Sequence, residues 1–521
     1  MTAASLGVFR SEAESRMKNR LKFFLLLAAI LFPGAVAYGH VGSADVYYEG
    51  KAGPYPLFVT IRMPPVIPGV AELRVRSESP DVQSVKVVLL RLTGPGSDLP
   101  STPDVAQRSK QDPQFFSSDL WFMEYGALQA RIVAEGAKGK GELSVPIASF
   151  PRQSQPMSPW MRIMGIFVLV GLTFVVVPVA GGIARESTVP AGDAPQSSNR
   201  RNGRIVMVLT LLAVGGIVFG ARSMWNEEDA VYARNVDLLK PPRVEATLQP
   251  GNRLVLRLTA PLMLPLAGKG REAVEVKLDE VIPDHGYLMH VFLVGMPGMD
   301  KVWHLHFDRA EGGTFAKTLP AMPAGDYRVF ADIVDKNGFP WTLLGSVKLP
   351  AIAGSAPAGD DSQWQGPRLT TPSAQPLVAQ LPDGGRLVWE RTDGPMRANV
   401  PASFRFRVED RNGAPASDVE PYMGMAAHMV VLRSDQSVFA HVHTNGSVPM
   451  AALDLAQAGL MAGSSAGATE MPMAMSHQHH ESLPPTFSIP YGVPRPGDYR
   501  FFVQIKRSGQ VQTAAFDAHV Q

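Results

Sequence analysis

The histidines of this chain recur in a pattern that could hold a metal ion. In the segment YLMHVFLVGMPGMDKVWHLH (287–306), two apolar runs flank a turn at Pro297-Gly298-Met299, and the second run ends in His-x-His. A hairpin at that turn predicts His290 opposite His306. Since strand side chains alternate between two faces, His304 shares the face of His306. Cross-strand neighbours lie about 5 Å apart, so the hairpin gathers three imidazoles.

A second copy follows in MAAHMVVLRSDQSVFAHVH (425–443), with its turn at 434–437. The same register predicts His428 opposite His443, with His441 on the same face. The spacing is kept although the two turns differ in sequence. We therefore predict two metal sites, formed by His290, His304 and His306 and by His428, His441 and His443.

The chain contains no cysteine and 23 methionines. Thiolate ligands are thus excluded, and the available ligands are imidazole, thioether and carboxylate. Met423 and Met425 precede the second histidine set, and a mixed His/Met set favours copper because a thioether suits Cu(I). Zinc and nickel also bind imidazole, and most methionines are core filler. Asp332 is a further candidate ligand, but its counterpart in the second copy is Gln504.

An internal repeat extends beyond the hairpins. Gly325-Asp326-Tyr327-Arg328 recurs as Gly497-Asp498-Tyr499-Arg500, and the offset grows from 138 residues at the first histidine (428 minus 290) to 172 at this strand (497 minus 325). The second copy therefore carries an insertion of about 35 residues, placed near 451–485. It holds a tract typical of metal-gathering loops, whose candidate ligands are Met471, Met473, Met475, His477, His479 and His480.

The N-terminal region predicts export. Residues 1–37 contain a basic segment, a short apolar run and a small-x-small end, as in a signal peptide, and Met17 is an alternative start. Processing near this end places His40 at or close to the new terminus. There its imidazole and an amine could chelate copper together, although a histidine near a terminus is more often solvated.

The remaining chain divides into β-rich parts around an apolar hairpin. Alternating runs in 38–158 predict a β-sandwich. Two apolar stretches, 163–184 and 205–221, predict transmembrane helices joined by a cytoplasmic loop, 185–204. The fold class is therefore mainly β: one sandwich, a two-helix hairpin, and two tandem related Ig-like sandwiches at 222–353 and 380–521. The Gly/Ser/Pro-rich segment 354–379 between those two is expected to be a mobile tether.

Composition excludes several functions. The formal net charge of +2 gives no support to nucleic-acid binding. We find no nucleophile elbow, phosphate loop or acid/base pair, so no enzymatic activity is predicted. The export signal and the hairpin together predict a bacterial plasma-membrane protein with most of its chain in the periplasm.

At its histidine hairpins the chain resembles bacterial exported β-sandwich modules for copper handling, including YtkA-like domains. The small CopC-type copper carriers also have a mature N-terminal histidine, comparable to His40. This resemblance covers roughly 275–350 and 400–521, and it implies copper binding or delivery outside the cytoplasm, with a metal-donor or metal-acceptor protein as partner. Two alternatives stay open: a non-catalytic cell-envelope interaction or adhesion protein with structural histidines, and a copper-dependent oxidase.

Overall fold

The fold is taken from a computed structural model of the chain, which describes residues 44–97, 102–154, 157–190, 192–265, 273–369, 377–391, 394–463 and 482–521. Residues 1–39 form a unit separate from 40–521, and only the second unit is described below. The predicted signal peptide, His40 and the Met/His tract lie outside the described residues.

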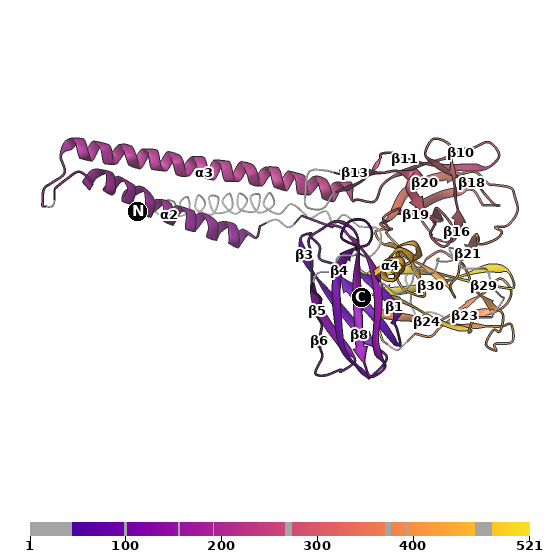
Figure 1. The fold of residues 1–521 in the computed structure, drawn as a ribbon. Helices are drawn as coiled ribbons and strands as arrows, with labels where there is room; N and C mark the ends of the chain where they lie inside the picture. The colour runs from indigo at the N-terminus through magenta and orange to yellow at the C-terminus, as the bar shows by residue number, and fades with distance from the viewer. Residues whose placement is uncertain are drawn as a thin grey trace, which may run out of the picture. The chain divides into compact units, whose positions relative to one another are not determined.

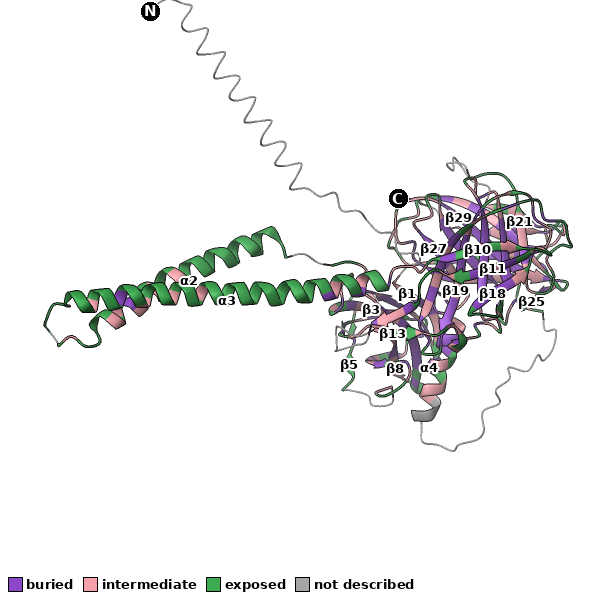
Figure 2. Ribbon diagram, turned by 90° about the horizontal axis from the view of Figure 1, so that it is seen from above, coloured by how far each residue is buried: buried purple, intermediate pink, exposed green. Residues whose placement is uncertain are grey.

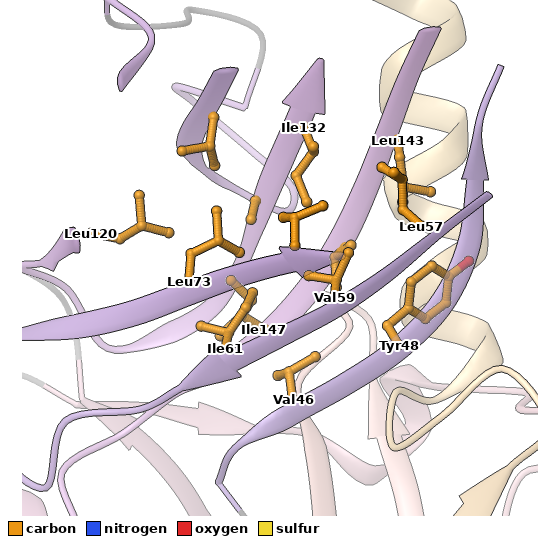
Figure 3. Close-up of a cluster of buried hydrophobic side chains, with 14 of the residues drawn as sticks. Val46, Tyr48, Leu57, Val59, Ile61, Leu73, Leu120, Ile132, Leu143 and Ile147 are labelled. Atoms are coloured by element: carbon orange, nitrogen blue, oxygen red, sulfur yellow. The ribbon is translucent and has the colours of Figure 1, made fainter. Parts of the chain in front are cut away.

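The first domain is the predicted β-sandwich (Figure 1). Its core contains Val59, Ile61, Leu73, Ile132 and Ile147, which come from both of its sheets (Figure 3). One sheet has the order β1 (Val46–Ala52), β2 (Tyr55–Arg62), β3 (Gly69–Ser77), β7 (Phe115–Phe122), β6 (Gln107–Arg108); the other has β5 (Asp104–Val105), β4 (Val82–Arg91), β8 (Gly126–Gly136), β9 (Gly139–Ser149).

Two long helices follow, α2 (Pro159–Glu186) and α3 (Ser197–Leu238), and both are long and apolar enough to cross a membrane. Their side chains are exposed along almost the whole length (Figure 2). Ser158 caps α2 by accepting a hydrogen bond from the Met161 amide, with Pro159 in the first turn. The two helices approach closely at a pair of glycines, since a Cβ on Gly203 would lie 2.8 Å from the Gly181 carbonyl oxygen.

Helix α3 is longer than predicted. It continues past the expected end at Ala221 to Leu238, and the next strand starts only at Val244. The added residues contain neither glycine nor proline, so nothing interrupts the helix until Pro241-Pro242. Its last turns contact the first domain, where the Ile67 amide donates to the Tyr232 hydroxyl (3.1 Å).

The second domain packs two sheets and a short ribbon around Leu254, Trp303, Leu305 and Phe315. One sheet has the order β10 (Val244–Gln249), β11 (Arg253–Leu258), β18 (Thr314–Thr318), β17 (Asp308–Ala310); the other has β14 (Val281–Ile282), β19 (Gly325–Asp335), β15 (His290–Met296), β16 (Lys301–His306), β21 (Ser362–Gln365), with β20 (Pro340–Leu349) also paired to β19. The ribbon is β12 (Leu262–Pro265) with β13 (Ala273–Val276), followed by the 3₁₀ turn η1 (Leu278–Glu280).

The third domain repeats this plan around Trp389, Phe406, Met429 and Phe501. One sheet has the order β22 (Val378–Gln380), β23 (Arg386–Trp389), β24 (Ala402–Glu409), β28 (Thr486–Tyr491); the other has β25 (Val419–Glu420), β29 (Gly497–Arg507), β26 (His428–Arg433), β27 (Phe439–His443), with β30 (Gln510–Val520) paired to β29. Helix α4 (Met450–Gly463) starts the predicted insertion.

The histidine-bearing sheets of the second and third domains pack against each other. Along β15, Val291 and Leu293 belong to the core of their own domain, whereas Phe292 and Val294 belong to a separate cluster with Val430 and other residues of the third domain. In that cluster the Phe330 and Phe439 rings stack with centroids 4.2 Å apart. Each of these sheets is therefore buried on both faces, which explains the continuous apolar runs in its strands.

The prediction of a mobile tether at 354–379 was wrong for its first half. Residues Ser362–Gln365 form β21, which pairs with the edge of β16. Just before it, Asp360 accepts hydrogen bonds from Tyr287 of the second domain and Lys506 of the third (both 3.0 Å). Polar side chains that composition assigns to a linker thus join the two domains.

Candidate metal centre

Seven of the 12 histidines meet inside the interface between the second and third domains. Both predicted registers are confirmed, because His290 pairs with His306 and His428 pairs with His443. The two hairpins face each other across the interface, so their histidines form one cluster. Its members are His285, His290, His304, His306, His428, His441 and His443.

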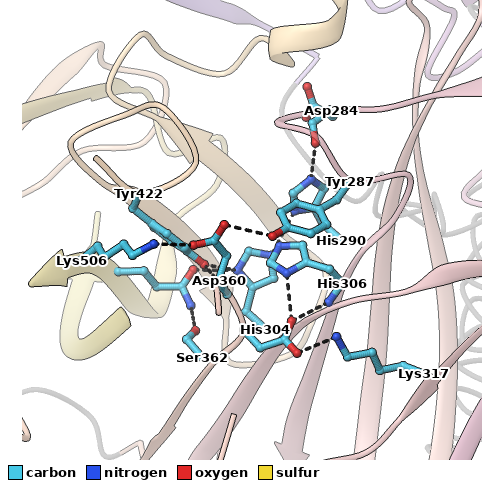
Figure 4. Close-up of polar contacts among 12 residues, drawn as sticks. Asp284, Tyr287, His290, His304, His306, Lys317, Asp360, Ser362, Tyr422 and Lys506 are labelled. Carbon is cyan, nitrogen blue, oxygen red and sulfur yellow. Dashed lines mark hydrogen bonds and ion pairs between the residues drawn. The ribbon is translucent and has the colours of Figure 1, made fainter. Parts of the chain in front are cut away.

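Within the cluster, His290, His304 and His306 form the first group, as predicted. One nitrogen of each lies within 4.8 Å of the others, and all three side chains are buried. His290 Nδ1 and His304 Nε2 lie 3.2 Å apart. Figure 4 shows these rings beside Tyr287 and Tyr422.

The outer nitrogen of each ring in the first group faces a hydrogen-bond acceptor. His290 Nε2–H donates to the Asp284 carbonyl (3.0 Å), and His306 Nδ1–H donates to the Asp361 carboxylate (2.9 Å). His304 Nδ1–H donates to Gln504 Oε1 (3.0 Å), whose amide nitrogen is turned toward Ser362. His304 Nδ1 also lies 3.1 Å from the Tyr422 hydroxyl, which itself donates to the Asp360 carbonyl. When each ring donates to these partners, its proton lies on the outer nitrogen. The lone pairs of His290 Nδ1, His304 Nε2 and His306 Nε2 are consequently left on the inner side.

The second group differs from the prediction, because His285 of the second domain takes the place expected for His441. It combines with His428 and His443 of the third domain, again with nitrogens within 4.8 Å of one another. His285 Nδ1–H donates to the Met423 carbonyl (2.9 Å) and His443 Nδ1–H to the Val448 carbonyl (3.3 Å). Their Nε2 atoms, both lone-pair bearers, lie 3.3 Å apart.

His441 lies between the two groups. Its ring centroid is 5.5 Å from that of His290 and 5.5 Å from that of His428. His441 Nδ1 is 3.6 Å from the Asp332 carboxylate. The cross-domain contacts correspond, because His304 meets Gln504 of the third domain while His441 meets Asp332 of the second. Asp332, the residue weighed as a ligand, and its counterpart Gln504 therefore each contact an imidazole of the other domain.

Hydrogen-bond accounting leaves unpartnered nitrogens where a ligand could bind. Among the described residues, His306 Nε2, His441 Nε2 and both nitrogens of His428 are buried without a hydrogen-bond partner. Buried polar atoms nearly always have a partner, so four such atoms in one cluster mark where a cation or water would bind.

Burial keeps most of these rings neutral. It lowers the pKa of His290, His304, His428 and His443 well below the usual value, and neighbouring imidazoles add to the shift. Burial also lowers the pKa of His441 to about 3 and raises the pKa of the Asp332 carboxyl to about 7. Neutral imidazole is the form that binds metals.

The turn that carries His285 recurs in the third domain. Pro283-Asp284-His285-Gly286 corresponds to Pro421-Tyr422-Met423-Gly424, at the same offset of 138 residues (421 minus 283) as the first histidines. His285 and Met423 both have φ near +50°, and glycines with positive φ follow them. This shared turn is the signal that could have identified His285 from the sequence.

The remaining predicted ligands have varied outcomes. Met423 contacts the second group through its backbone carbonyl, and Met425 is buried. His519, which was not predicted, is exposed and pairs with Asp498 (2.7 Å) outside the cluster. The candidates outside the described residues are His40, Met471, Met473, Met475, His477, His479 and His480.

Fold and site together define a mainly β protein with a two-helix hairpin and two three-histidine groups at a domain interface. Residues 382–521 match a family described as a domain of unknown function (DUF8832). This match covers the third domain and says nothing of the other two. The comparison with curated proteins gave no match.

Several solved structures show remote similarity. Latent PorU from Porphyromonas gingivalis is 10% identical with a TM-score of 0.13, and the match covers 92% of this chain but only 34% of PorU. A putative membrane anchored protein from Corynebacterium diphtheriae is 10% identical, with coverages of 91% and 95% and a TM-score of 0.14. The mixed-linkage glucan protein SGBP-B from Bacteroides ovatus is 10% identical, with coverages of 87% and 64% and a TM-score of 0.12. At these scores the similarities carry no argument about function.

Proposed function

We propose that this protein binds copper outside the cytoplasm, anchored by its helical hairpin, and exchanges it with a donor or acceptor protein. The first ion is held by His290, His304 and His306. The second is held by His285, His428 and His443, with ligands from both domains. The protein is a carrier and not an enzyme in this proposal.

The observation that carries the proposal is the pair of facing imidazole nitrogens in each group. His290 Nδ1 faces His304 Nε2 at 3.2 Å, and the Nε2 atoms of His285 and His443 face each other at 3.3 Å. When each ring donates its outer N–H to its own acceptor, no hydrogen is left for these two contacts. Two lone pairs at that distance repel unless a cation lies between them. A tetrahedral ion with bonds of about 2.0–2.1 Å holds its ligand nitrogens about 3.3 Å apart.

The outer partners support the same conclusion. Metal-bound histidines usually donate their second N–H to a carboxylate, a backbone carbonyl or a similar acceptor, which fixes the ring. Five of the six proposed ligands have such a partner, and only His428 lacks one. A merely structural ladder of histidines has no need for lone pairs that converge.

Copper is favoured over zinc by the ligand types. Both groups consist of imidazoles, and the chain offers thioethers but no thiolate. Soft thioether ligands select Cu(I), so the Met/His tract of the third domain suits a copper donor or acceptor step. Zinc with three histidines is the competing outcome.

The test is the number and identity of ions bound by the purified full chain in detergent. Cu(I), Cu(II) and Zn(II) are titrated separately and counted by elemental analysis after exchange into buffer. We expect two tightly held copper ions, with one lost in His304→Ala/His306→Ala and the other in His428→Ala/His443→Ala.

His519→Ala is the matched control, since His519 lies outside the cluster. Ions bound by the Met/His tract are identified by repeating the titration after replacing Met471, Met473, Met475, His477, His479 and His480. Binding that survives both double variants, or a preference for zinc in all forms, would contradict the proposal.

A further inference from the structure

A partly open cavity of about 180 Å³ reaches the histidine cluster where the three β domains meet. The first domain contributes Ala44–Val46 and Pro146–Ala148 to its wall, although this domain has no histidine among its described residues. The second and third domains contribute Asp332, His441 and His443. Of the three, His443 belongs to a three-histidine group and the other two do not.

Asp332 and His441 form the polar part of this wall nearest the cluster. The Asp332 side chain is 23% exposed and that of His441 only 5%, so the carboxylate lies on the open side of the pair. The Thr342 hydroxyl holds the carboxylate by donating to Oδ1 (2.6 Å). His441 Nε2 has no hydrogen-bond partner.

His441 lies beside both groups. Its ring centroid lies 5.6 Å from His304 in the first group and 4.7 Å from His443 in the second. A ligand at such a position can reach an ion on the way to either group without changing its own backbone. Weak intermediate ligands of this kind speed the transfer of an ion because each step replaces one bond at a time.

We propose that ions reach the interface through this cavity, and that Asp332 and His441 form a transit site that loads both three-histidine groups. This inference rests on the proposed function. It assigns a role to the first domain, which forms part of the access path. Strand β1 also holds the loop after His443, since Ser447 N donates to the Tyr47 carbonyl and Glu49 N donates to the Asn445 carbonyl (both 2.9 Å).

The test measures uptake rates of Cu(I) and Zn(II) by the full chain in detergent, using stopped-flow competition with a coloured chelator. His441→Leu and His441→Met are compared because the two residues have similar volumes but only Met offers a thioether. We expect uptake of both ions to slow about tenfold in the Leu variant. The Met variant should recover the Cu(I) rate and leave the Zn(II) rate slow.

Two further variants separate the path from the ligand. Ala148→Phe narrows the part of the cavity that the first domain lines. It should slow the uptake and the release of ions by the same factor, because an obstructed path slows movement in both directions. Asp332→Asn should slow uptake of Zn(II) more than that of Cu(I), because the doubly charged ion gains more from the carboxylate.

The results distinguish the two proposals. If the wild-type chain binds no ion, the proposed function fails. If it binds two ions but His441→Leu takes them up at the wild-type rate, the transit site is wrong. Equal slowing of Cu(I) in the Leu and Met variants would also overturn it, since that result indicates a packing role for His441.

Discussion

The chemistry of the site depends on which nitrogen of each imidazole carries the proton. Asp361 is the carboxylate among the hydrogen-bond partners of the first group. Its burial acts to raise the pKa of the carboxyl, but hydrogen bonds from His306 and Lys317 outweigh burial and hold the pKa below the usual value. The carboxylate is therefore charged when it accepts the hydrogen bond from His306 Nδ1–H. His306 Nε2, on the other side of the ring, has no hydrogen-bond partner.

Asp361→Ala is predicted to weaken the first site selectively. Loss of the acceptor frees the His306 ring to rotate and to change tautomer, and such outer partners typically contribute a factor of about 10–100 in metal affinity. Competitive chelator titration measures the two sites. Asp498→Ala is the control, because it removes the carboxylate from the exposed His519 in the same way. Equal affinities in Asp361→Ala and wild type would contradict this role.

Acidification should destabilise the metal-free protein through His441. Its folded pKa of about 3 lies below the value of about 6.5 in an unfolded chain, so between these values the unfolded state binds more protons and stability falls as the pH falls. Between pH 7 and pH 5 the free energy of unfolding should fall by about 2 kcal/mol because of His441. Asp332, with its raised pKa, stabilises the folded state as the pH falls. Its effect is common to the wild type and to a variant that changes only His441.

Chemical denaturation at pH 7 and pH 5 checks this prediction in wild type and His441→Gln, without metal. The wild type should lose about 2 kcal/mol more than the variant over that interval. Identical pH dependence would indicate that His441 is protonated or solvated in the folded protein.

At the scale of the strands and turns, the sequence predicts more of the first group than of the second. Period-two alternation within one hairpin places His290, His304 and His306 correctly, because all three belong to one local element. The interface is not local. Nothing in the register of β26 and β27 reveals that His285, from another domain, displaces His441.

The same limit applies to the segment before β21. Its composition indicates a flexible linker, yet Asp360 and Asp361 contact Tyr287, Lys506 and His306. Composition reports what a segment favours in isolation, whereas these contacts depend on two domains being packed together. The mainly β fold class was confirmed because it depends on local patterns.

His285→Asn is predicted to remove the second ion with little effect on the fold. His285 has a φ of 50°, and asparagine tolerates this left-handed conformation while being too short to replace the imidazole. Metal counting should give one ion per chain in place of two.

Met423→Asn, at the corresponding turn, is the matched comparison. It leaves the carbonyl that accepts the His285 proton and removes only the thioether. Two ions in this variant would show that the backbone is the relevant part of Met423. Retention of two ions in His285→Asn would show instead that the second group does not use His285.

At the scale of the whole molecule, the histidine cluster lies inside an apolar interface that holds two domains together. The ring of Phe439 stacks on Phe330 and contacts Phe292, whose ring lies 5.0 Å from that of His441. The distance between the histidines of the second and third domains therefore depends on how these phenyl rings pack. Tight domain packing and metal binding should be linked.

Phe439→Ala tests this linkage. Removing a buried phenyl ring lowers the free energy of unfolding by about 3–5 kcal/mol. Phe439 and His441 line the same cavity, so the space left by the ring adjoins the histidine cluster. We expect the unfolding midpoint of the metal-free protein to fall and the affinity of the interdomain site to fall more than that of the first site. Phe406→Ala, a core position of the third domain alone, is the control. An equal loss at both sites would argue against interdomain coupling.

The most direct test of the whole account is the position of the ions in copper-loaded crystals of the full chain, located by anomalous diffraction. We predict two peaks in the interface, each about 2 Å from its ligand nitrogens. One lies among His290 Nδ1, His304 Nε2 and His306 Nε2, and the other among the Nε2 atoms of His285 and His443 and a nitrogen of His428. Copper peaks found only outside the interface, with both groups free of anomalous signal, would contradict the account.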